Sequence, residues 1–135
     1  MLGRMVYRIA FLLGLVVTPV AANEVLSPEY FENFAEGKTL FFDQAGRRYG
    51  VEQYLPGRQS IWQFADGTCK KGIWYARKEL ICFLYEGDDQ EQCWQFLRKG
   101  PDLAARAEGN SPKDDLIVVG RNEAPISCRG PDVGV

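Results

Sequence analysis

Short apolar runs broken by turn-forming residues fill most of this chain, and no other feature constrains its fold as strongly. The runs recur about every 10 to 12 residues, the spacing of strands in a small all-β domain. They are residues 39–42, 48–55, 60–64, 72–76, 80–85, 92–98, 103–107 and 116–119. The breaks fall at 43–46, 56–57, 66–67, 77–78, 87–89, 100–101 and 109–112. This pattern predicts a mainly β fold, an antiparallel meander of about eight short strands that forms a small barrel or a strongly bent sheet.

One segment, residues 28–36, departs from this pattern and predicts a helix ahead of the strands. Ser27 is suited to cap its N-terminus, Pro28 to its first position, and Gly37 to the left-handed residue that closes it. Four apolar residues form one stripe along it: Tyr30, Phe31, Phe34 and Ala35. We therefore expect this helix to pack against the sheet.

Residues 1–22 have the order of a secretory signal peptide. Arg4 and Arg8 give a basic start, an apolar run spans 9–17, and small residues lead up to Ala22. An apolar run of about nine residues is too short for a transmembrane helix, which needs roughly 20. We predict cleavage after Ala22, a periplasmic or secreted protein, and no membrane span in the mature chain.

The mature chain has the size and charge of one mildly acidic domain. Residues 1–22 hold two of the 16 basic residues and none of the 18 acidic ones, so 14 minus 18 leaves a formal charge of −4. Such a charge makes nucleic acid a poor partner. The pattern predicts one β-rich domain over residues 23–121, followed by an irregular tail at 122–135.

The chain contains no histidine. The usual general base, the Ser-His and Cys-His nucleophile pairs and the commonest metal ligand are therefore missing. We predict a protein that is not an enzyme and that holds neither a cofactor nor a metal.

Four cysteines in an exported chain predict two disulfides. If the turn at 77–78 is tight, Ala76 pairs with Glu79, and the next turn can set Cys82 opposite Cys93, close enough to bridge. We favour Cys82–Cys93 with Cys69–Cys128. The alternative, Cys69–Cys82 with Cys93–Cys128, needs a bulge because its first two residues are four positions out of step in this register.

The same hairpins are apolar on both faces. One face carries Trp74, Ile81, Phe83, Tyr85, Trp94 and Phe96, and the other carries Ile73, Tyr75, Cys82, Leu84 and Leu97. We expect one face to line the core or barrel interior, and the helix or the Cys128 tail to cover the other.

Candidate site residues are few. The densest carboxylates, Glu86, Asp88, Asp89 and Glu91, share one predicted turn, which is better explained as a solvated hairpin tip than as a pair acting on a glycoside. Aromatic side chains can stack a sugar or line a pocket, although Trp74 and Trp94 suit the core. Basic pairs at strand ends can form a rim that meets an acidic partner. The candidate binding residues are Trp62, Tyr49, Tyr54, Arg77 and Lys78.

The run Asp66-Gly67-Thr68-Cys69-Lys70-Lys71-Gly72-Ile73-Trp74, followed by Cys82 and Cys93, resembles a family of small exported bacterial proteins of unknown function. That resemblance implies an envelope protein with a similar β domain, and it implies no catalytic residue. A looser resemblance is to lipocalin-like barrels, which share the meander and a G-x-W pair, here Gly72-Ile73-Trp74. In lipocalins that pair opens the first strand, whereas here it lies mid-chain.

These features together favour a non-catalytic binding or protein-interaction module of the cell envelope. Side chains alone nearly fill the interior of a small eight-stranded barrel, so recognition is expected at its rims. The alternative is a lipocalin-like carrier of a small apolar ligand. A third possibility is a carboxylate-based glycan enzyme. The partner is expected to be an envelope protein or a small ligand.

Overall fold

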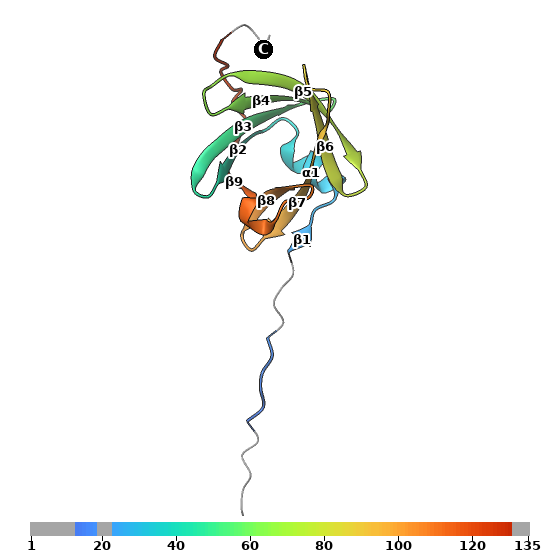
Figure 1. Ribbon diagram of the computed structural model, residues 1–135, viewed down its shortest axis with the longest axis vertical. Helices are drawn as coiled ribbons and strands as arrows, with labels where there is room; N and C mark the ends of the chain where they lie inside the picture. The colour runs from blue at the N-terminus through green and yellow to red at the C-terminus, as the bar shows by residue number, and fades with distance from the viewer. Residues whose placement is uncertain (1–12, 19–22, 131–135) are drawn as a thin grey trace, which may run out of the picture.

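The structure, a computed structural model, describes residues 13–18 and 23–130 and is mainly β with one α-helix (Figure 1). In chain order the elements are β1 (Glu24–Val25), α1 (Pro28–Ala35), β2 (Thr39–Gln44), β3 (Arg47–Leu55), β4 (Gln59–Phe64), β5 (Cys69–Arg77), β6 (Leu80–Tyr85), β7 (Gln92–Lys99), β8 (Asp102–Ala107), a 3-10 turn (Pro112–Asp114) and β9 (Leu116–Asn122). Strands β2 to β9 correspond to the eight predicted runs. The two-residue strand β1 was not predicted, because a pair of residues carries no alternation.

The sheet closes into an eight-stranded antiparallel barrel. Each strand from β2 to β8 pairs with the next along the chain, and β9 pairs with both β8 and β2. Strand β1 pairs with β7 at Arg98 and Leu97, beyond the last residue that β7 pairs with β6. Closure leaves no long edge strand, so the backbone hydrogen bonds of the ring are satisfied internally. The predicted meander is confirmed, and it forms a closed barrel.

Helix α1 closes one end of the barrel from within, against the inner side of the strands (Figure 1). The Ser27 hydroxyl caps it by accepting from the Tyr30 N–H at 3.1 Å, and Gly37 takes φ 73°, both as predicted. Phe31, 1 % exposed, packs against core aromatics on three strands: Tyr54, Trp74 and Phe96. Arg58, in the turn before β4, binds Glu32 of the helix at 2.9 Å. Phe31 and Ala35 of the predicted stripe are buried in the barrel end, whereas Phe34 is partly buried and Tyr30 is exposed, so the helix does not cover an outer face.

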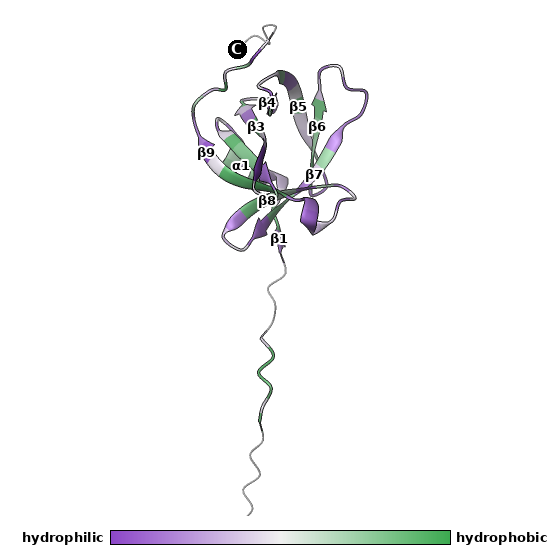
Figure 2. Cartoon of the chain, turned by 60° about the vertical axis from the view of Figure 1, so that its left-hand side comes forward, coloured by the Kyte–Doolittle hydropathy of each residue, from purple (hydrophilic) through white to green (hydrophobic). Residues whose placement is uncertain are grey.

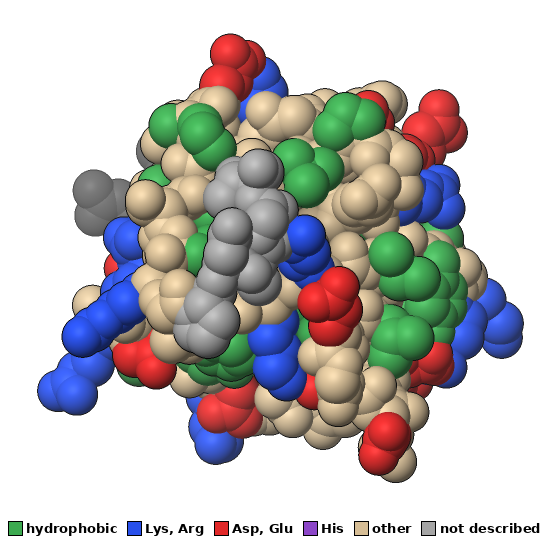
Figure 3. All heavy atoms as spheres, turned by 90° about the horizontal axis from the view of Figure 1, so that it is seen from above, with side chains coloured by type: hydrophobic (Ala, Val, Ile, Leu, Met, Phe, Trp, Pro, Cys, Tyr) green, Lys and Arg blue, Asp and Glu red, His purple; other side chains and the backbone are tan. Residues whose placement is uncertain are grey.

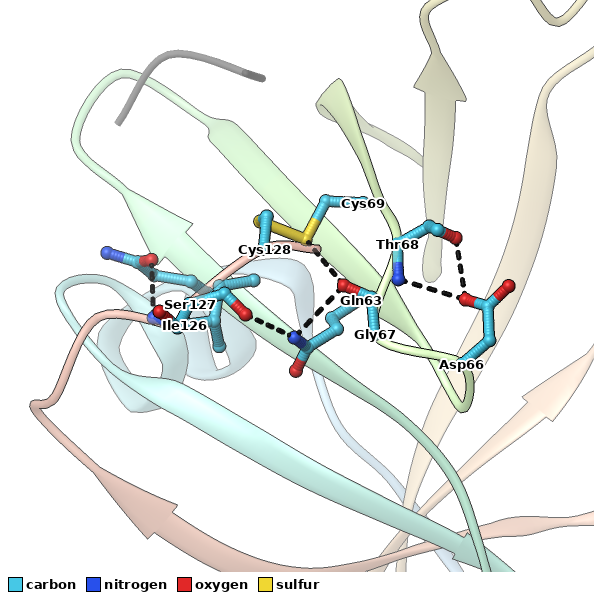
Figure 4. The surroundings of a disulfide bond; sticks show 9 residues. Gln63, Asp66, Gly67, Thr68, Cys69, Ile126, Ser127 and Cys128 are labelled. Carbon is cyan, nitrogen blue, oxygen red and sulfur yellow. Dashed lines mark hydrogen bonds between the residues drawn. A yellow bond between two sulfur atoms is a disulfide. The ribbon is translucent and has the colours of Figure 1, made fainter. Parts of the chain in front are cut away.

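Residues 123–130, which follow β9, pack on the outside of the barrel. Ile126 covers Val51 and Ile61, whose side chains point outward from β3 and β4. Figure 4 shows the contacts that fix this segment, in which Gln63 donates to the Ser127 carbonyl at 2.7 Å beside the Cys69–Cys128 disulfide. This part of the tail is irregular but held in place, and it covers the outer face of β3 and β4, not that of the central hairpins as predicted.

Both favoured disulfides are present, Cys69–Cys128 and Cys82–Cys93. The predicted register of the β5–β6 hairpin is wrong by two residues, since Ala76 pairs with Ile81 and not with Glu79. Lys78 adopts φ 55° and forms the two-residue turn with Glu79, so Arg77 remains in the strand. A shift of two preserves the faces, and Cys82 still lies opposite Cys93.

The outer face of this hairpin is less covered than predicted. Ile73 and Leu84, paired across β5 and β6, are 52 % and 37 % exposed. The Cys82–Cys93 disulfide fills the neighbouring row, where both sulfur-bearing residues are buried. Covalent closure between β6 and β7 therefore replaces a covering element over this part of the wall.

Hydrophilic residues predominate in the turns, whereas hydrophobic stretches lie within the strands, which carry hydrophilic residues as well (Figure 2). Acidic and basic side chains are interspersed over the face shown in Figure 3. Among the described residues, no helix combines the length and apolar character that crossing a bilayer requires. Two structural disulfides are typical of proteins that fold in an oxidising compartment.

The predicted signal peptide and its cleavage site lie largely outside the described residues, as does the end of the predicted tail at 131–135. The described part of the signal, residues 13–18, has no regular secondary structure, and its apolar side chains are exposed. These residues contribute nothing to the barrel core.

Candidate functional site: a cavity inside the barrel

The barrel encloses a cavity of about 640 Å³. Its closed end is formed by Tyr54 and Phe96, whose rings rest on Phe31 of the helix at centroid distances of 5.4 and 4.2 Å. Its open end lies among the turns that join β4 to β5 and β6 to β7, beside Phe64 at the end of β4 and Tyr49 near the start of β3, which are 41 % and 43 % exposed. A volume of this size suits a small organic molecule.

The expectation that side chains nearly fill the barrel is therefore wrong, and two glycines supply the reason. A Cβ at Gly50 would lie 2.1 Å from Cζ2 of Trp62, and one at Gly72 would lie 2.6 Å from Cδ1 of Tyr85. Both aromatic rings thus lie directly against the backbone of a neighbouring strand. Because the rings follow the wall and do not cross the barrel, the centre stays open.

A buried carboxyl group, Glu52, lines this cavity. It points inward from β3, opposite Trp62, and is 3 % exposed. The Tyr85 hydroxyl donates to its Oε1 at 2.6 Å, and the Tyr54 hydroxyl donates to its Oε2 at 3.0 Å. The Ser60 hydroxyl also faces Glu52, but its geometry falls short of a hydrogen bond and it has no other partner among the described residues.

Burial is the dominant influence on this carboxyl group. It raises the pKa of Glu52 to about 7, although the Tyr85, Ser60 and Tyr54 hydroxyls act in the opposite direction. Burial likewise raises the pKa values of Tyr54 and Tyr85 well above 10, and the neighbouring Glu52 charge adds to that effect. The tyrosines therefore stay protonated as donors, while Glu52 changes its charge near neutral pH.

Charged groups also stand nearer the open end. The Lys70 ammonium contacts the Asp88 carboxylate at 2.6 Å, joining β5 to the β6–β7 turn. Asp66 accepts from the Thr68 N–H and hydroxyl at 2.9 and 2.7 Å, and these bonds lower its pKa. One positive against three negative groups gives the lining a formal charge of −2 when Glu52 is ionised.

Three of the five candidate binding residues meet in this cavity: Trp62, Tyr49 and Tyr54. The other two, Arg77 and Lys78, lie elsewhere. Arg77 reaches Glu91 and Glu108 at 3.0 and 2.9 Å on the outside of the wall, and Lys78 is exposed in the β5–β6 turn. The predicted aromatic and basic groups therefore do not form one site.

The acidic turn divides between the two sides of the wall. Asp88 lines the cavity, whereas Glu91 binds Tyr75 and Arg77 outside it. Glu91 also lies beside the sulfurs of Cys82 and Cys93, but those two atoms are joined in the disulfide and offer no thiolate to a metal. Trp74 lies in the core as expected, while Trp94 is only partly buried and lines the cavity.

Sequence reasoning missed Glu52, Gly50 and Gly72. The alternation of β3 contains a signal for the first, because Glu52 stands two residues before Tyr54 and must share its face. A carboxyl group on the same strand face as a core tyrosine is the mark of an interior polar site. The glycines carry no comparable signal, because their importance depends on which ring lies above them.

Fold and cavity together define a closed antiparallel meander barrel with a helix at one end and an internal site open at the other. Comparison with family models, curated proteins and solved structures finds no match for this chain. The two resemblances seen in the sequence therefore stay predictions. The lipocalin-like G-x-W residues lie in β5, where Gly72 supports the ring of Tyr85 and Trp74 packs on the helix.

Proposed function

We propose that this protein is a non-catalytic binding protein that holds a small, largely aromatic or apolar ligand inside its barrel. The cavity is the observation that carries this proposal. Its walls are mostly apolar rings, and its few polar groups converge from different strands, which is the usual composition of a small-molecule site. A folded barrel that needed only rims for recognition would gain stability from filling this space.

The sequence alone favoured an interaction module over a carrier of a small ligand, and the cavity favours the carrier. An interaction module that uses its rims stays the second candidate, because Ile73 and Leu84 leave a small apolar area on the outer wall. Cross-linking in the cell envelope separates the two. A protein partner captured through the β5–β6 hairpin, with no small molecule in the barrel, would favour the module.

The carrier proposal is tested by native mass spectrometry of protein purified from its own organism, followed by titration with the neutral fluorescent probe N-phenyl-1-naphthylamine. We expect a bound small molecule, or one saturable probe site with enhanced emission. Ala105→Phe adds a ring to the cavity wall opposite Phe96. It is expected to weaken probe binding about tenfold or more, equivalent to about 1.4 kcal/mol.

The matched control is Val119→Leu, which adds apolar volume at an exposed position of β9. It should bind the probe like the unmodified protein. Absence of both a native ligand and a saturable probe site would contradict the carrier proposal, as would equal probe binding by Ala105→Phe and Val119→Leu.

A further inference from the structure

An ionised Glu52 destabilises the barrel wall unless a partner compensates its buried charge. A buried carboxylate without a cation is disfavoured, and two tyrosine hydroxyls only partly replace its water. A glutamine of nearly the same shape would accept the same kind of hydrogen bond without that cost. The placement of the acid in a ligand-sized cavity is therefore the feature that requires an explanation.

The groups around Glu52 leave acceptors unused. An ionised carboxylate offers about four acceptor positions, and the tyrosines occupy two of them. The Ser60 oxygen, 1 % exposed, has no hydrogen-bond partner among the described residues. The hydroxyls of Tyr54 and Tyr85 already donate to Glu52. The Glu52 carboxylate therefore has acceptor positions to offer a ligand in the cavity, and the two tyrosine donors beside it are engaged.

Aromatic faces surround the same carboxyl group. Trp62 is its cross-strand partner, and Phe83 stacks on Tyr85 with ring centroids 6.0 Å apart. All three rings line the cavity. The face of an aromatic ring attracts a cation, most strongly where water is excluded.

The single lysine of the lining does not make the cavity favour anions over cations. Lys70 is matched by Asp88 at 2.6 Å, so the pair is close to neutral. Asp66 and Glu52 remain as negative groups toward the open and the closed end respectively. Arg129 offsets part of the Asp66 charge, whereas no cation acts on Glu52 among the described residues, so the cavity repels an anionic ligand and attracts a cationic one most strongly at the depth of Glu52.

From this arrangement we infer that the cavity selects ligands that carry a protonated amine on an apolar or aromatic body, with the amine held by Glu52 among Trp62, Phe83 and Tyr85. The inference rests on the proposed binding function and gives its ligand class. An ammonium group supplies three donors and no acceptor, which complements the free acceptor positions of Glu52. The apolar body would lie against Phe96 and Trp94, which line the cavity from β7.

Three dansyl sulfonamides with the same five-atom tether test this inference by fluorescence titration. Their ends are a primary amine, an alcohol and a carboxylate. At pH 7.5 we expect the amine to bind about tenfold more tightly than the alcohol and the carboxylate to bind least, as expected when a charge meets a buried partner. Glu52→Gln should weaken binding of the amine about tenfold while changing binding of the alcohol little, which removes the preference.

Glu86→Gln is the matched control, because Glu86 lies in the turn at the open end but does not line the cavity. It should keep the order of the three probes. Equal binding of amine and alcohol, tighter binding of the carboxylate, or an amine preference that survives Glu52→Gln would overturn the inference while leaving the carrier proposal standing. Failure of all three probes, together with N-phenyl-1-naphthylamine, would instead contradict the carrier proposal itself.

Discussion

At the scale of single residues, Glu52 couples the interior of the barrel to pH. Its pKa is about 7 in the folded protein and 4.5 in its ordinary state. Between these values the folded protein keeps a proton that the unfolded chain releases, so stability falls as pH rises through this window. The lowered pKa values of Asp115 and Asp66 act in the opposite sense, because the stability they contribute is lost as pH falls below about 4.

Chemical denaturation should therefore show a loss of about 2.5 kcal/mol in the free energy of unfolding between pH 5 and pH 8, because most of this pKa shift takes effect within that interval. Glu52→Gln cannot ionise, so it should lose much less over the same interval. The Gln variant also serves as its own control for folding, since its stability at pH 5 should stay close to that of the unmodified protein. An identical pH dependence in both proteins would contradict the assignment.

Gly50 contributes to stability because its missing side chain leaves room for the Trp62 ring. Gly50→Ala would place a methyl group 2.1 Å from the Trp62 ring, which must then leave the wall and enter the cavity. We expect a loss of about 1–3 kcal/mol in the free energy of unfolding, typical of overpacking, measured by urea denaturation.

The comparison variant is Gly120→Ala on β9, where the new methyl group would sit 3.4 Å from Phe41 on the outer face. Ordinary contact at that distance predicts little change, or a small gain from the lower entropy of the unfolded chain. Equal losses from the two substitutions would show that the Trp62 ring does not depend on Gly50.

At the scale of elements, the tail after β9 behaves as a strap on the outer wall. Its bond from Cys128 to Cys69 closes a loop with a sequence separation of 59 residues, worth about 4 kcal/mol in the chain-entropy description. Replacing both cysteines by serine should lower the free energy of unfolding by about that amount, measured by denaturation under non-reducing conditions. Probe binding by the folded protein should persist, because Ile126 covers Val51 and Ile61 outside the barrel.

The Cys82–Cys93 bond gives the companion measurement. Its sequence separation is 11 residues, so the same relation predicts a smaller loss of about 3 kcal/mol when both cysteines become serine. Loss of probe binding by a folded Cys69→Ser, Cys128→Ser variant would contradict the prediction that the tail does not affect the cavity.

At the scale of the whole molecule, closure of the meander produces a barrel with an internal cavity. The pairing of β7 with β8, and of β9 with β2, removes the long edges of the sheet and creates an inside that the helix closes at one end. The ligand titrations described above test this level, since the cavity exists only in the closed barrel. An anion-rich lining within an acidic chain also directs the choice of ligand toward cations.

The sequence by itself determined the elements and much of their order. Alternation and turn residues located the eight barrel strands, Ser27 and Gly37 bounded the helix, and the period of two kept Cys82 and Cys93 on one face despite a register error of two. These features are local, because each depends on residues near in the chain, and a slip of two leaves faces unchanged.

Only the tertiary structure decided that the strands form a closed ring and that this ring contains a cavity. It also decided that Glu52 lies in the cavity with two tyrosines from different strands. Each of these depends on which distant residues meet: Trp62 above Gly50, Tyr85 above Gly72, and the tail over Val51. The alternation of residues in a strand predicts which side chains share a face. It does not predict how the large side chains pack within the enclosed space. The volume left inside, and therefore the proposed function, is a property of packing across strands, which no single strand records.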